Sequence, residues 1–593
     1  VYKRQVYLVF FMNKPDRVTS ILTQVVMIAL ITVVIGGILF LAMWVIDSPF
    51  WRVITMVTLS IGLLFLGSAS KLKPVAATLA LITGYSLDLL GSAPVGEAAV
   101  RGLLYAWLFV AIPVAVSLVL NLLIGPAPVN FARRKIRDRL RVARNVLSSN
   151  DPKFQQRLSV LLFEGNEEIN KWLKLTTLEH TTHSDEIEKL RRLSRTSFEI
   201  LTFLSIHSED ALIAPIRTAI REFIDTLQSQ VRSMNPLQPF NLPQKLKSLE
   251  TDAELGCLVR GFTSILNEHN PHKLQLNHST TSGTPAGFFL PDAFTNPSHI
   301  HYALRTTGAA MTCYFLYNLM DWAGIHTCFI TCYIVSLGTA AESVAKLRLR
   351  IVGCLMGAAF GVFVMIELIP YVTSIESLIL IVFFGTLLAG WVSAGGASIS
   401  YAGFQIAFAF YLCVLQGASP EFDLSIARDR VIGVLLGNFI AYIFITGLWP
   451  ISIGGRLDAR LLEFFKSLQG LDGNSASAFY LDARKIRTDL DLARIEPTGV
   501  RPSIKEIELR EAMVDSGLKV AADMLSGKSN PSECTLALES FNRNLVFRLG
   551  RQPMRSTGTA KGEQPFQIVS LSLRRLENLV SEIHPLMKSE SHV

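Results

Sequence analysis

Charged residues are scarce in this sequence. Asp, Glu, Lys and Arg make up 18% of its 593 residues, whereas about 25% is usual in soluble proteins. Hydrophobic residues make up 50%, and the mean hydropathy is +0.38. A chain of this composition must bury long apolar runs in lipid, which excludes a single soluble domain.

Signatures of catalysis and of cofactor binding are also missing. Five of the seven cysteines lie within apolar runs, and no pair has the spacing of a zinc site or a redox motif, so we expect reduced packing thiols. Gly527–Ser529 resembles the end of a phosphate-binding loop, but Ala522 stands where that loop needs glycine, and no strand precedes it. We therefore predict that the protein is not an enzyme and has no cofactor or metal site.

The distribution of positive charge argues against nucleic-acid binding. The net charge is +8, but the densest basic cluster, Arg133–Arg144, directly follows an apolar run. Such clusters mark the cytoplasmic end of a membrane helix. We therefore expect membrane lipid, and no nucleic acid, among the partners of this chain.

Apolar runs predict two groups of membrane helices. The first group has four spans, near Ile21–Ile46, Val53–Ser70, Val75–Leu90 and Gly102–Ile124. The second group has six, near Ala303–Met320, Ala323–Ala341, Ile351–Ile369, Ser374–Ser393, Ala397–Gln416 and Val431–Trp449. The chain starts at Val1 with a half-apolar stub, Val6–Met12, which we interpret as the end of a further span. The first bundle is thus expected to lack its N-terminal helices.

The predicted fold is an all-α polytopic membrane protein. Residues 1–127 and 301–451 would form two transmembrane bundles, and each would be followed by a cytoplasmic helical domain, residues 128–300 (with a Pro-, Ser- and Asn-rich linker) and 452–593. A similar loop motif, Gly91–Pro94 and Gly417–Pro420, precedes a span in each bundle. Because both bundles begin and end inside, we expect two parallel repeats.

The charged stretch Glu342–Arg350 is predicted to be the cytoplasmic turn between two spans. Glu342 and Lys346 are one helical turn apart, which permits an ion pair. That pair would be an interfacial lock or, as the alternative, a cytoplasmic gate or a proton-coupled pair. Arg348 and Arg350 are expected to anchor the turn at the lipid interface, with anion binding as the alternative.

Glycines recur at every fourth position in two spans. Gly353, Gly357 and Gly361 follow the charged turn, and Gly433 and Gly437 lie in the last span. This spacing places the glycines of each span on one helix face, where a neighbouring backbone can approach closely. We expect both faces to be helix-packing surfaces.

Charges also open spans on the predicted outer side. Arg428, Asp429 and Arg430 begin the last span, and Arg101 begins the fourth. Asp429 would complement the N-terminus of its helix. The arginines would either hold the two halves of the protein together or capture carboxylates that leave the pathway, and the sequence leaves both interpretations open.

Three polar side chains are candidates for a substrate or proton pathway. Gln405 lies in the middle of a span beside Tyr401 and Phe404, and it needs a partner at that depth. It would form a helix–helix hydrogen bond or the polar contact of a site for a flat aromatic acid. Asp321 and His326 would be solvated helix ends or, as the alternative, a pair that carries protons.

Several segments resemble a known family. PDAFTNPSHIHYALR (291–305), AESVAKLRLRIVGCLMG (341–357) and YAGFQIAFAFYLCVLQG (401–417) are similar to the fusaric acid resistance (FUSC), or aromatic acid exporter, family, above all to its inner-membrane multidrug efflux subunits. The resemblance covers the membrane portion of the chain.

The resemblance implies a multi-pass protein of the bacterial inner membrane with cytoplasmic soluble domains. It would export aromatic acids or amphiphilic drugs, driven by protons, together with a periplasmic adaptor (membrane fusion protein) and an outer-membrane channel. A homo-oligomer would fit this role. The alternatives are a passive anion channel of related architecture and a scaffold that docks the adaptor.

Overall fold

The chain is almost entirely helical where its structure is described. The computed structural model describes residues 15–70, 73–92, 96–149, 151–180, 182–207, 214–232, 240, 256–269, 287–372, 374–396, 399–415, 424–471, 475–525, 538 and 541. Within these residues, β pairing is limited to an isolated bridge between Ser70 and Phe289. Val6–Met12, Gly417–Pro420 and Gly527–Ser529 lie outside the described residues, as does part of Gly91–Pro94.

The chain divides into two compact units. We call them the membrane unit, which consists of Val1–Gly125, Thr280–Ile453 and Ile495–Arg501, and the polar unit, which consists of Pro126–Ser279, Gly454–Arg494 and Pro502–Val593. The sequence predicted four segments, and most of the first and third fall in the membrane unit, whereas most of the second and fourth fall in the polar unit. The parallel repeat stays a prediction.

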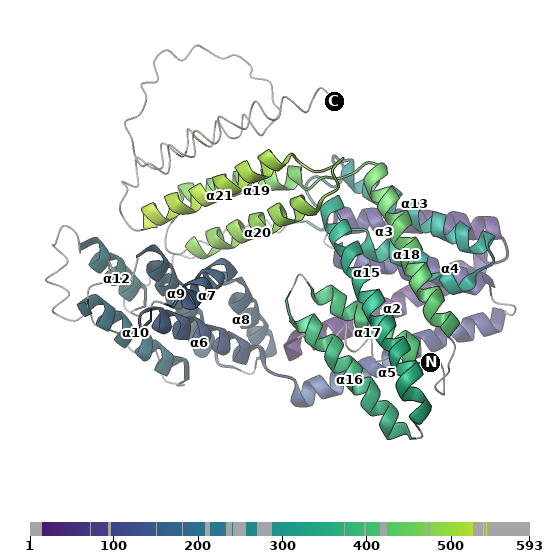
Figure 1. Ribbon diagram of the computed structural model, residues 1–593, viewed down its shortest axis with the longest axis horizontal. Helices are drawn as coiled ribbons and strands as arrows, with labels where there is room; N and C mark the ends of the chain where they lie inside the picture. Colours follow the sequence, from purple (N-terminus) through teal and green to yellow (C-terminus); the bar gives the residue numbers. More distant parts are fainter. Residues whose placement is uncertain are drawn as a thin grey trace, which may run out of the picture. The chain divides into compact units, whose positions relative to one another are not determined.

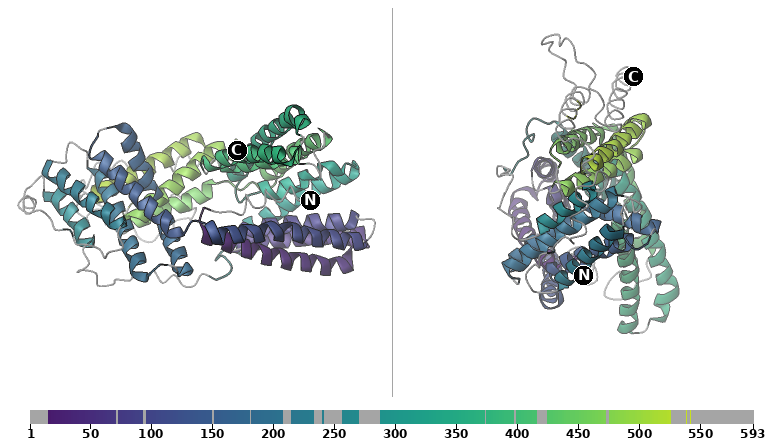
Figure 2. Two further views of the ribbon diagram at one scale, coloured as in Figure 1. Left: turned by 90° about the horizontal axis from the view of Figure 1, so that it is seen from below. Right: turned by 90° about the vertical axis from the view of Figure 1, so that its left-hand side faces the viewer.

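The first four helices of the membrane unit match the predicted spans. They are α2 (Arg17–Val45), α3 (Pro49–Ala69), α4 (Lys73–Ser92) and α5 (Gly96–Ile124). The carboxylate of Asp16 caps α2 by accepting a hydrogen bond from Thr19 N at 2.8 Å. Helix α2 packs on α5, and α3 packs on α4 (Figure 2).

The second half of the membrane unit is less regular than the sequence predicted (Figure 1). Its helices are α13 (Ser298–Leu319), the 3-10 turn η4 (Ala323–Ile325), α14 (Thr327–Val335), α15 (Ala340–Phe363), the π and 3-10 turns η5 (Val364–Leu368) and η6 (Ile369–Tyr371), α16 (Ile375–Ala394), α17 (Ser400–Val414) and α18 (Leu424–Gly447). The hydroxyl of Ser60 on α3 lies 2.8 Å from that of Thr307 and 2.9 Å from that of Tyr333, so the two predicted bundles pack together.

The predicted span Ala323–Ala341 and the predicted turn Glu342–Arg350 are wrong. Helix α14 ends at Val335, and α15 begins at Ala340, with Thr339 as its N-cap. Thr339 and Glu342 form a capping box, which starts a helix there. The residues that follow are mostly Ala, Lys, Leu and Arg, which all favour helix, so Lys346 and Arg350 lie inside α15.

Much of the membrane unit presents apolar side chains outward. Within the described residues, six helical segments are long and apolar enough to cross a membrane, namely Arg17–Val45, Pro49–Ala69, Val100–Ile124, Ala340–Tyr371, Ile375–Ala394 and Ala427–Gly447. On α16, Phe384 is 62% exposed and Trp391 is 78% exposed. Large side chains of this kind are stable on a protein surface only when lipid or another apolar partner covers them.

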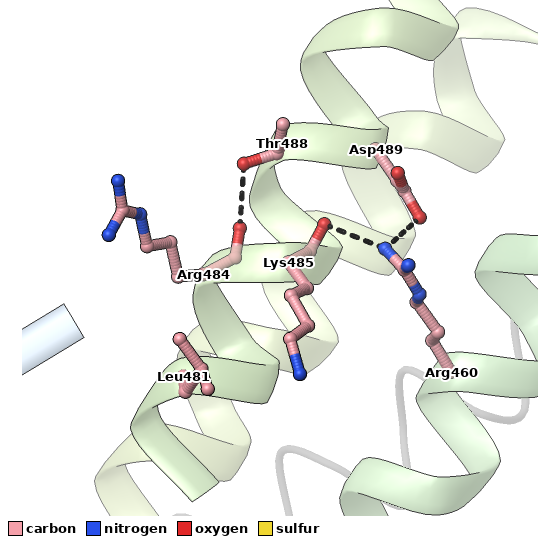
Figure 3. A pocket seen from close by; sticks show the side chains of 6 residues that line it. All are labelled: Arg460, Leu481, Arg484, Lys485, Thr488 and Asp489. Atoms are coloured by element: carbon pink, nitrogen blue, oxygen red, sulfur yellow. Dashed lines mark hydrogen bonds and ion pairs between the residues drawn. The ribbon is translucent and has the colours of Figure 1, made fainter. Parts of the chain in front are cut away.

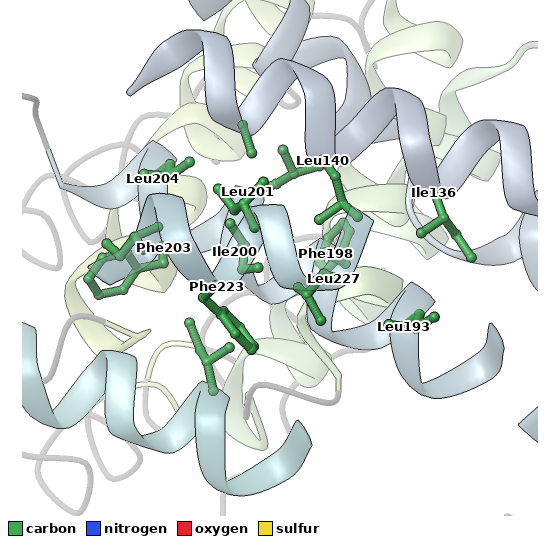
Figure 4. Close-up of a cluster of buried hydrophobic side chains, with 14 of the residues drawn as sticks. Ile136, Leu140, Leu193, Phe198, Ile200, Leu201, Phe203, Leu204, Phe223 and Leu227 are labelled. Carbon is green, nitrogen blue, oxygen red and sulfur yellow. The ribbon is translucent and has the colours of Figure 1, made fainter. Parts of the chain in front are cut away.

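The polar unit is a helical domain with an apolar core. Its helices are α6 (Pro128–Val146), α7 (Pro152–Glu164), α8 (Glu167–Glu179), α9 (Ser184–Ile206), α10 (Ala214–Arg232), α12 (Gly256–His269), α19 (Gly454–Gln469), α20 (Ala476–Ile495) and α21 (Ile504–Leu525). Phe198 and Leu201 of α9 and Phe223 of α10 are buried in the core (Figure 4). The ring of Tyr480, on α20, lies 6.3 Å from that of Phe198, so the polar segments from both parts of the sequence pack together.

Candidate functional site

Helices α15 and α17 lie unusually close to each other. A Cβ atom added to Gly353 would lie 2.6 Å from Gln405 Cβ, and one added to Gly357 would lie 2.5 Å from Ile406 O. At Gly361 the nearest atom would be Cys413 Cβ, at 2.6 Å. All three glycines therefore face α17, and their missing side chains permit the contact.

A buried arginine lies at this interface. Arg350 is 1% exposed; its Nη1 donates to the hydroxyl of Tyr401 at 3.1 Å, and its Nη2 donates to Thr331 Oγ1 at 3.0 Å. Nε is buried and has no hydrogen-bond partner in the described structure. Arg350 therefore links α14, α15 and α17 and is not the interfacial anchor that we expected. Arg348 is exposed, as an anchor would be.

Lys346 and Gln405 complete a polar cluster around Tyr401. Lys346 Nζ lies 5.0 Å from the centroid of the Tyr401 ring, a cation–π contact. Gln405 is 3% exposed, and its side chain approaches Tyr401. Phe404 is half-buried on the same helix. We call Thr331, Lys346, Arg350, Tyr401 and Gln405 the cationic cluster. In the described structure no carboxylate forms an ion pair with Lys346 or Arg350.

The expected ion pair between Glu342 and Lys346 does not form. The carboxylate of Glu342 turns back to the helix start, where it accepts from Thr339 N at 3.4 Å. Lys346 instead lies over Tyr401. The capping box therefore holds the Glu342 carboxylate at the start of α15, away from Lys346.

The start of α18 packs against α14 through two glycines. A Cβ atom on Gly433 would lie 3.0 Å from Ile325 O, and one on Gly437 would lie 2.6 Å from Cys328 O. Beside this contact, Arg430 Nη1 donates to Thr327 Oγ1 at 2.5 Å and lies 3.0 Å from His326 Nε2. Arg430 therefore connects α18 to the start of α14.

Asp429 and Arg428 form a second connection near the same helix end. Asp429 Oδ2 accepts from Trp322 Nε1 at 3.1 Å, and Arg428 donates to Asp429 Oδ1 from Nε at 3.1 Å. These contacts give both residues a structural part in fixing the η4 turn. Arg101 is different, because its ion pair in the described structure is with Glu97 at 2.6 Å, and both side chains are 69% exposed. Such a pair contributes little stability.

The described structure does not bring Asp321 and His326 together as a proton-carrying pair. Asp321 is exposed in a turn with a positive φ of 49°, whereas His326 stacks on Tyr85 with ring centroids 5.5 Å apart. A different carboxylate is held nearby: Asp88 Oδ2 accepts from the Tyr317 hydroxyl at 2.6 Å. Asp88 belongs to α4 and Tyr317 to α13, 229 residues further along the chain, so only the folded structure shows this contact.

Arg305 is a further buried arginine, and it is not among the residues predicted from the sequence. This arginine of α13 is 1% exposed, and its Nη2 donates to Leu337 O at 2.8 Å and to Gly338 O at 3.3 Å. Both carbonyls belong to the break between α14 and α15. The signal was present, because an arginine inside an apolar span is a functional candidate by default.

A pocket in the polar unit is a weaker candidate. It has a volume of about 250 Å³ and is lined by Arg460, Leu481, Arg484, Lys485, Thr488 and Asp489 (Figure 3). Asp489 is already neutralised by Arg456 at 3.0 Å and Arg460 at 2.5 Å, so these charges hold α19 to α20. No group of three His, Cys, Asp or Glu side chains suited to a metal occurs within the described residues.

The helical composition and the six apolar segments define a polytopic α-helical membrane protein, which confirms the predicted fold class. Residues 312–444 match the family model of fusaric acid resistance protein-like proteins. The chain is therefore similar to this family over residues 312–444, and the resemblance that its motifs indicated is confirmed.

The curated relatives carry one name. The multidrug resistance protein MdtO of Shigella flexneri is 31% identical over 251 residues, which is 41% of this chain and 36% of the relative. MdtO of Escherichia coli strain K12 is 30% identical over 253 residues, again 41% of this chain and 36% of the relative. The matches thus span little more than a third of the relatives' length. No solved structure matches this chain.

Proposed function

We propose that this protein is an efflux transporter that exports organic anions, with aromatic carboxylates as the substrate class. The observation that carries the proposal is Arg350, which is 1% exposed beside Tyr401 and has a buried nitrogen without a partner in the described structure. A substrate carboxylate would supply the counter-charge for Arg350 and Lys346. The named role of the MdtO relatives, multidrug resistance, supports export as the direction of transport.

The chemistry of the cationic cluster suits an aromatic acid. A guanidinium binds a carboxylate through two parallel hydrogen bonds. The Tyr401 ring offers a face for stacking, and the buried amide of Gln405 offers a neutral polar contact. Lys346 is only half-buried, which leaves one side of the cluster open to a ligand.

The proposal places the protein in the bacterial inner membrane with its polar unit in the cytoplasm. The basic segment that follows α5 supports this topology, because Arg133–Arg144 would be retained inside. We further propose that protons drive export and that a periplasmic adaptor and an outer-membrane channel complete the route. We also propose that the protein forms a homo-oligomer.

Transport measurements test the proposal. Cells that express the chain should accumulate less radiolabelled benzoate or fusaric acid than cells without it, and an uncoupler should remove the difference. Arg350→Gln should abolish export, whereas Arg348→Gln, an exposed arginine on the same helix, should retain it. Equal accumulation with and without the chain, with the protein present in the membrane, would refute the proposal.

A passive anion channel is the second candidate, because uncompensated buried cations would also attract anions that flow downhill. Electrical recording from reconstituted protein separates the two. A large unitary current would identify a channel, and accumulation against a substrate gradient would identify a pump.

A further inference from the structure

The break between α14 and α15 is held by one face of α13. Ser336–Gly338 is not helical, so its carbonyl groups need other donors, whereas Ser336 N donates to Cys332 O and Leu337 N donates to Ser343 Oγ at 2.9 Å. The hydroxyl of Tyr302 donates to Ser336 O at 3.3 Å, and Thr306 Oγ1 lies 2.6 Å from Ser336 Oγ. Arg305 donates to the carbonyls of Leu337 and Gly338. Three residues of α13 thus contact the break and provide donors to its carbonyls.

The two carbonyls of the break do not need a charged donor such as Arg305. A neutral donor would satisfy two carbonyls, but a guanidinium also brings a full positive charge into the bundle. Nε and Nη1 of Arg305 are buried and have no hydrogen-bond partner in the described structure. No carboxylate in the described structure forms an ion pair with Arg305; the nearby ring is that of Tyr302, whose centroid lies 5.8 Å from Cζ.

Arg510 in the polar unit shows how this chain compensates a buried arginine. It is 4% exposed and donates to Asp458 at 3.0 Å and to Glu506 at 3.2 Å. Burial alone would lower the pKa of Arg510, but these two carboxylates raise it above its usual value. Arg305 is as deeply buried and has no carboxylate partner in the part of the chain that the structure describes, and an uncompensated buried charge is strongly destabilising.

The helix ends at the break do not cancel this charge. The C-terminal end of α14 contributes about half a negative charge and the N-terminal end of α15 about half a positive one, so the two offset each other. The first amides of α15 are already used: Ala340 N donates to Ile451 O at 2.9 Å, and Glu342 N donates to Thr339 Oγ1 at 3.3 Å. The buried donors that have no partner in the described structure are Nε and Nη1 of Arg305.

We propose that Arg305 and the break form a binding site for a small monovalent anion of halide size, with chloride as the ligand. Leu337 and Gly338 are partly exposed, so an anion can reach the site from the side of the break. Ser336 is 3% exposed and Thr306 is 1% exposed beside it, which restricts the ligand to a small ion. The site differs from the cationic cluster and does not depend on the proposed transport.

Thermal unfolding of the purified full chain tests the site. At equal ionic strength, chloride or bromide should raise the unfolding midpoint saturably relative to gluconate. Arg305→Gln should weaken the apparent chloride affinity by about tenfold or more. Arg348→Gln should leave it unchanged, and so should Arg350→Gln, which separates this site from the substrate site. Equal midpoints in chloride and gluconate, or a chloride effect that survives in Arg305→Gln, would overturn the proposal.

A second measurement uses only the unaltered chain, in case Arg305→Gln does not fold. Hydrogen exchange of the backbone segment Ser336–Ser343 should slow when chloride replaces gluconate, because the ion orders the break. The amides of α9 in the polar unit should show no change. An exchange rate in Ser336–Ser343 that is independent of chloride would overturn the proposal.

Discussion

The guanidinium of Arg350 donates to the hydroxyl of Tyr401 at 3.1 Å, across the interface between α15 and α17. The contact depends on the glycines of α15, because a side chain at Gly353 would push α17 away. The same feature of the sequence, a glycine at every fourth position, thus creates the packing and brings the cation to the ring.

Tyr401→Phe should weaken the binding of an aromatic carboxylate by about tenfold, because Arg350 loses a partner that orients it. The control is Tyr411→Phe on the same helix, whose hydroxyl lies 2.6 Å from Thr386 Oγ1, outside the cluster. Binding of labelled benzoate to the purified chain measures both. Similar affinities in the two variants would contradict a role for Tyr401 in the site.

Gly357→Ala should destabilise the membrane unit by about 1–3 kcal/mol, because the new methyl group would meet Ile406 O at 2.5 Å. Gly62→Ala is the control, since a Cβ atom there has nothing within 4 Å. In the control, alanine should be neutral or gain up to about 1 kcal/mol of helix propensity. Thermal unfolding of both variants decides the matter, and an equal effect would mean that the two helices are not in close contact.

The sequence predicted the membrane helices well where an apolar run is both long and uninterrupted. Helices α2–α5 and α16 lie within a few residues of their expected positions, because the length of an apolar run sets the length of a span. The break at Ser336–Gly338 was missed, although Thr339 and Glu342 carry the capping-box pattern. High charge density in Glu342–Arg350 predicts a loop, but lysine and arginine are good helix formers, so the helix continues through this stretch.

The candidate site was predicted in part. Tyr401, Gln405 and Arg350 were each singled out from their position in or beside an apolar run, and the described structure brings them together. Their contacts were beyond prediction, because Thr331 reaches Arg350 only through the packing of α14 against α15. Asp321 and His326 are close in the sequence, but the turn between them keeps the two side chains apart.

The packing of α13 on α14 can be tested through two cysteines. Cys313 Sγ and Cys332 Sγ lie 3.5 Å apart, and a small shift would bring them to the roughly 2.05 Å of a disulfide. Treating membranes with copper–phenanthroline should therefore join them within one chain, with the loss of two hydrogen atoms to the oxidant. Peptide mapping by mass spectrometry detects the link. Cys332→Ala should abolish it, and a failure of the unaltered chain to form it would argue against this packing.

The segment before α13 should make a pH-dependent contribution to stability. Asn296 donates to Asp292 Oδ2 at 3.0 Å, and this hydrogen bond lowers the pKa of Asp292 below its ordinary value of 3.8. A lowered carboxylate pKa contributes stability above the unfolded pKa, and this contribution is lost as the pH falls through the folded pKa.

Asp292→Asn should therefore lower the unfolding midpoint slightly at neutral pH, and the difference from the unaltered chain should shrink as the pH falls below 3.8. The control is Asn296→Ala, which removes the donor and should produce the same pH dependence. A difference that does not change with pH in the acidic range would mean that the hydrogen bond does not act through ionisation.

Proton coupling, if it accompanies export, should depend on Asp88. Its Oδ2 accepts from the Tyr317 hydroxyl at 2.6 Å, and Arg52 is near enough to interact with it electrostatically. Asp88→Asn keeps the size of the side chain and an acceptor for Tyr317 but cannot exchange a proton. We expect this variant to bind benzoate normally and to lose the uncoupler-sensitive part of export. Asp47→Asn, at an exposed position between α2 and α3, should retain both properties. Uncoupler-sensitive export that persists in Asp88→Asn would exclude Asp88 as the proton-carrying group.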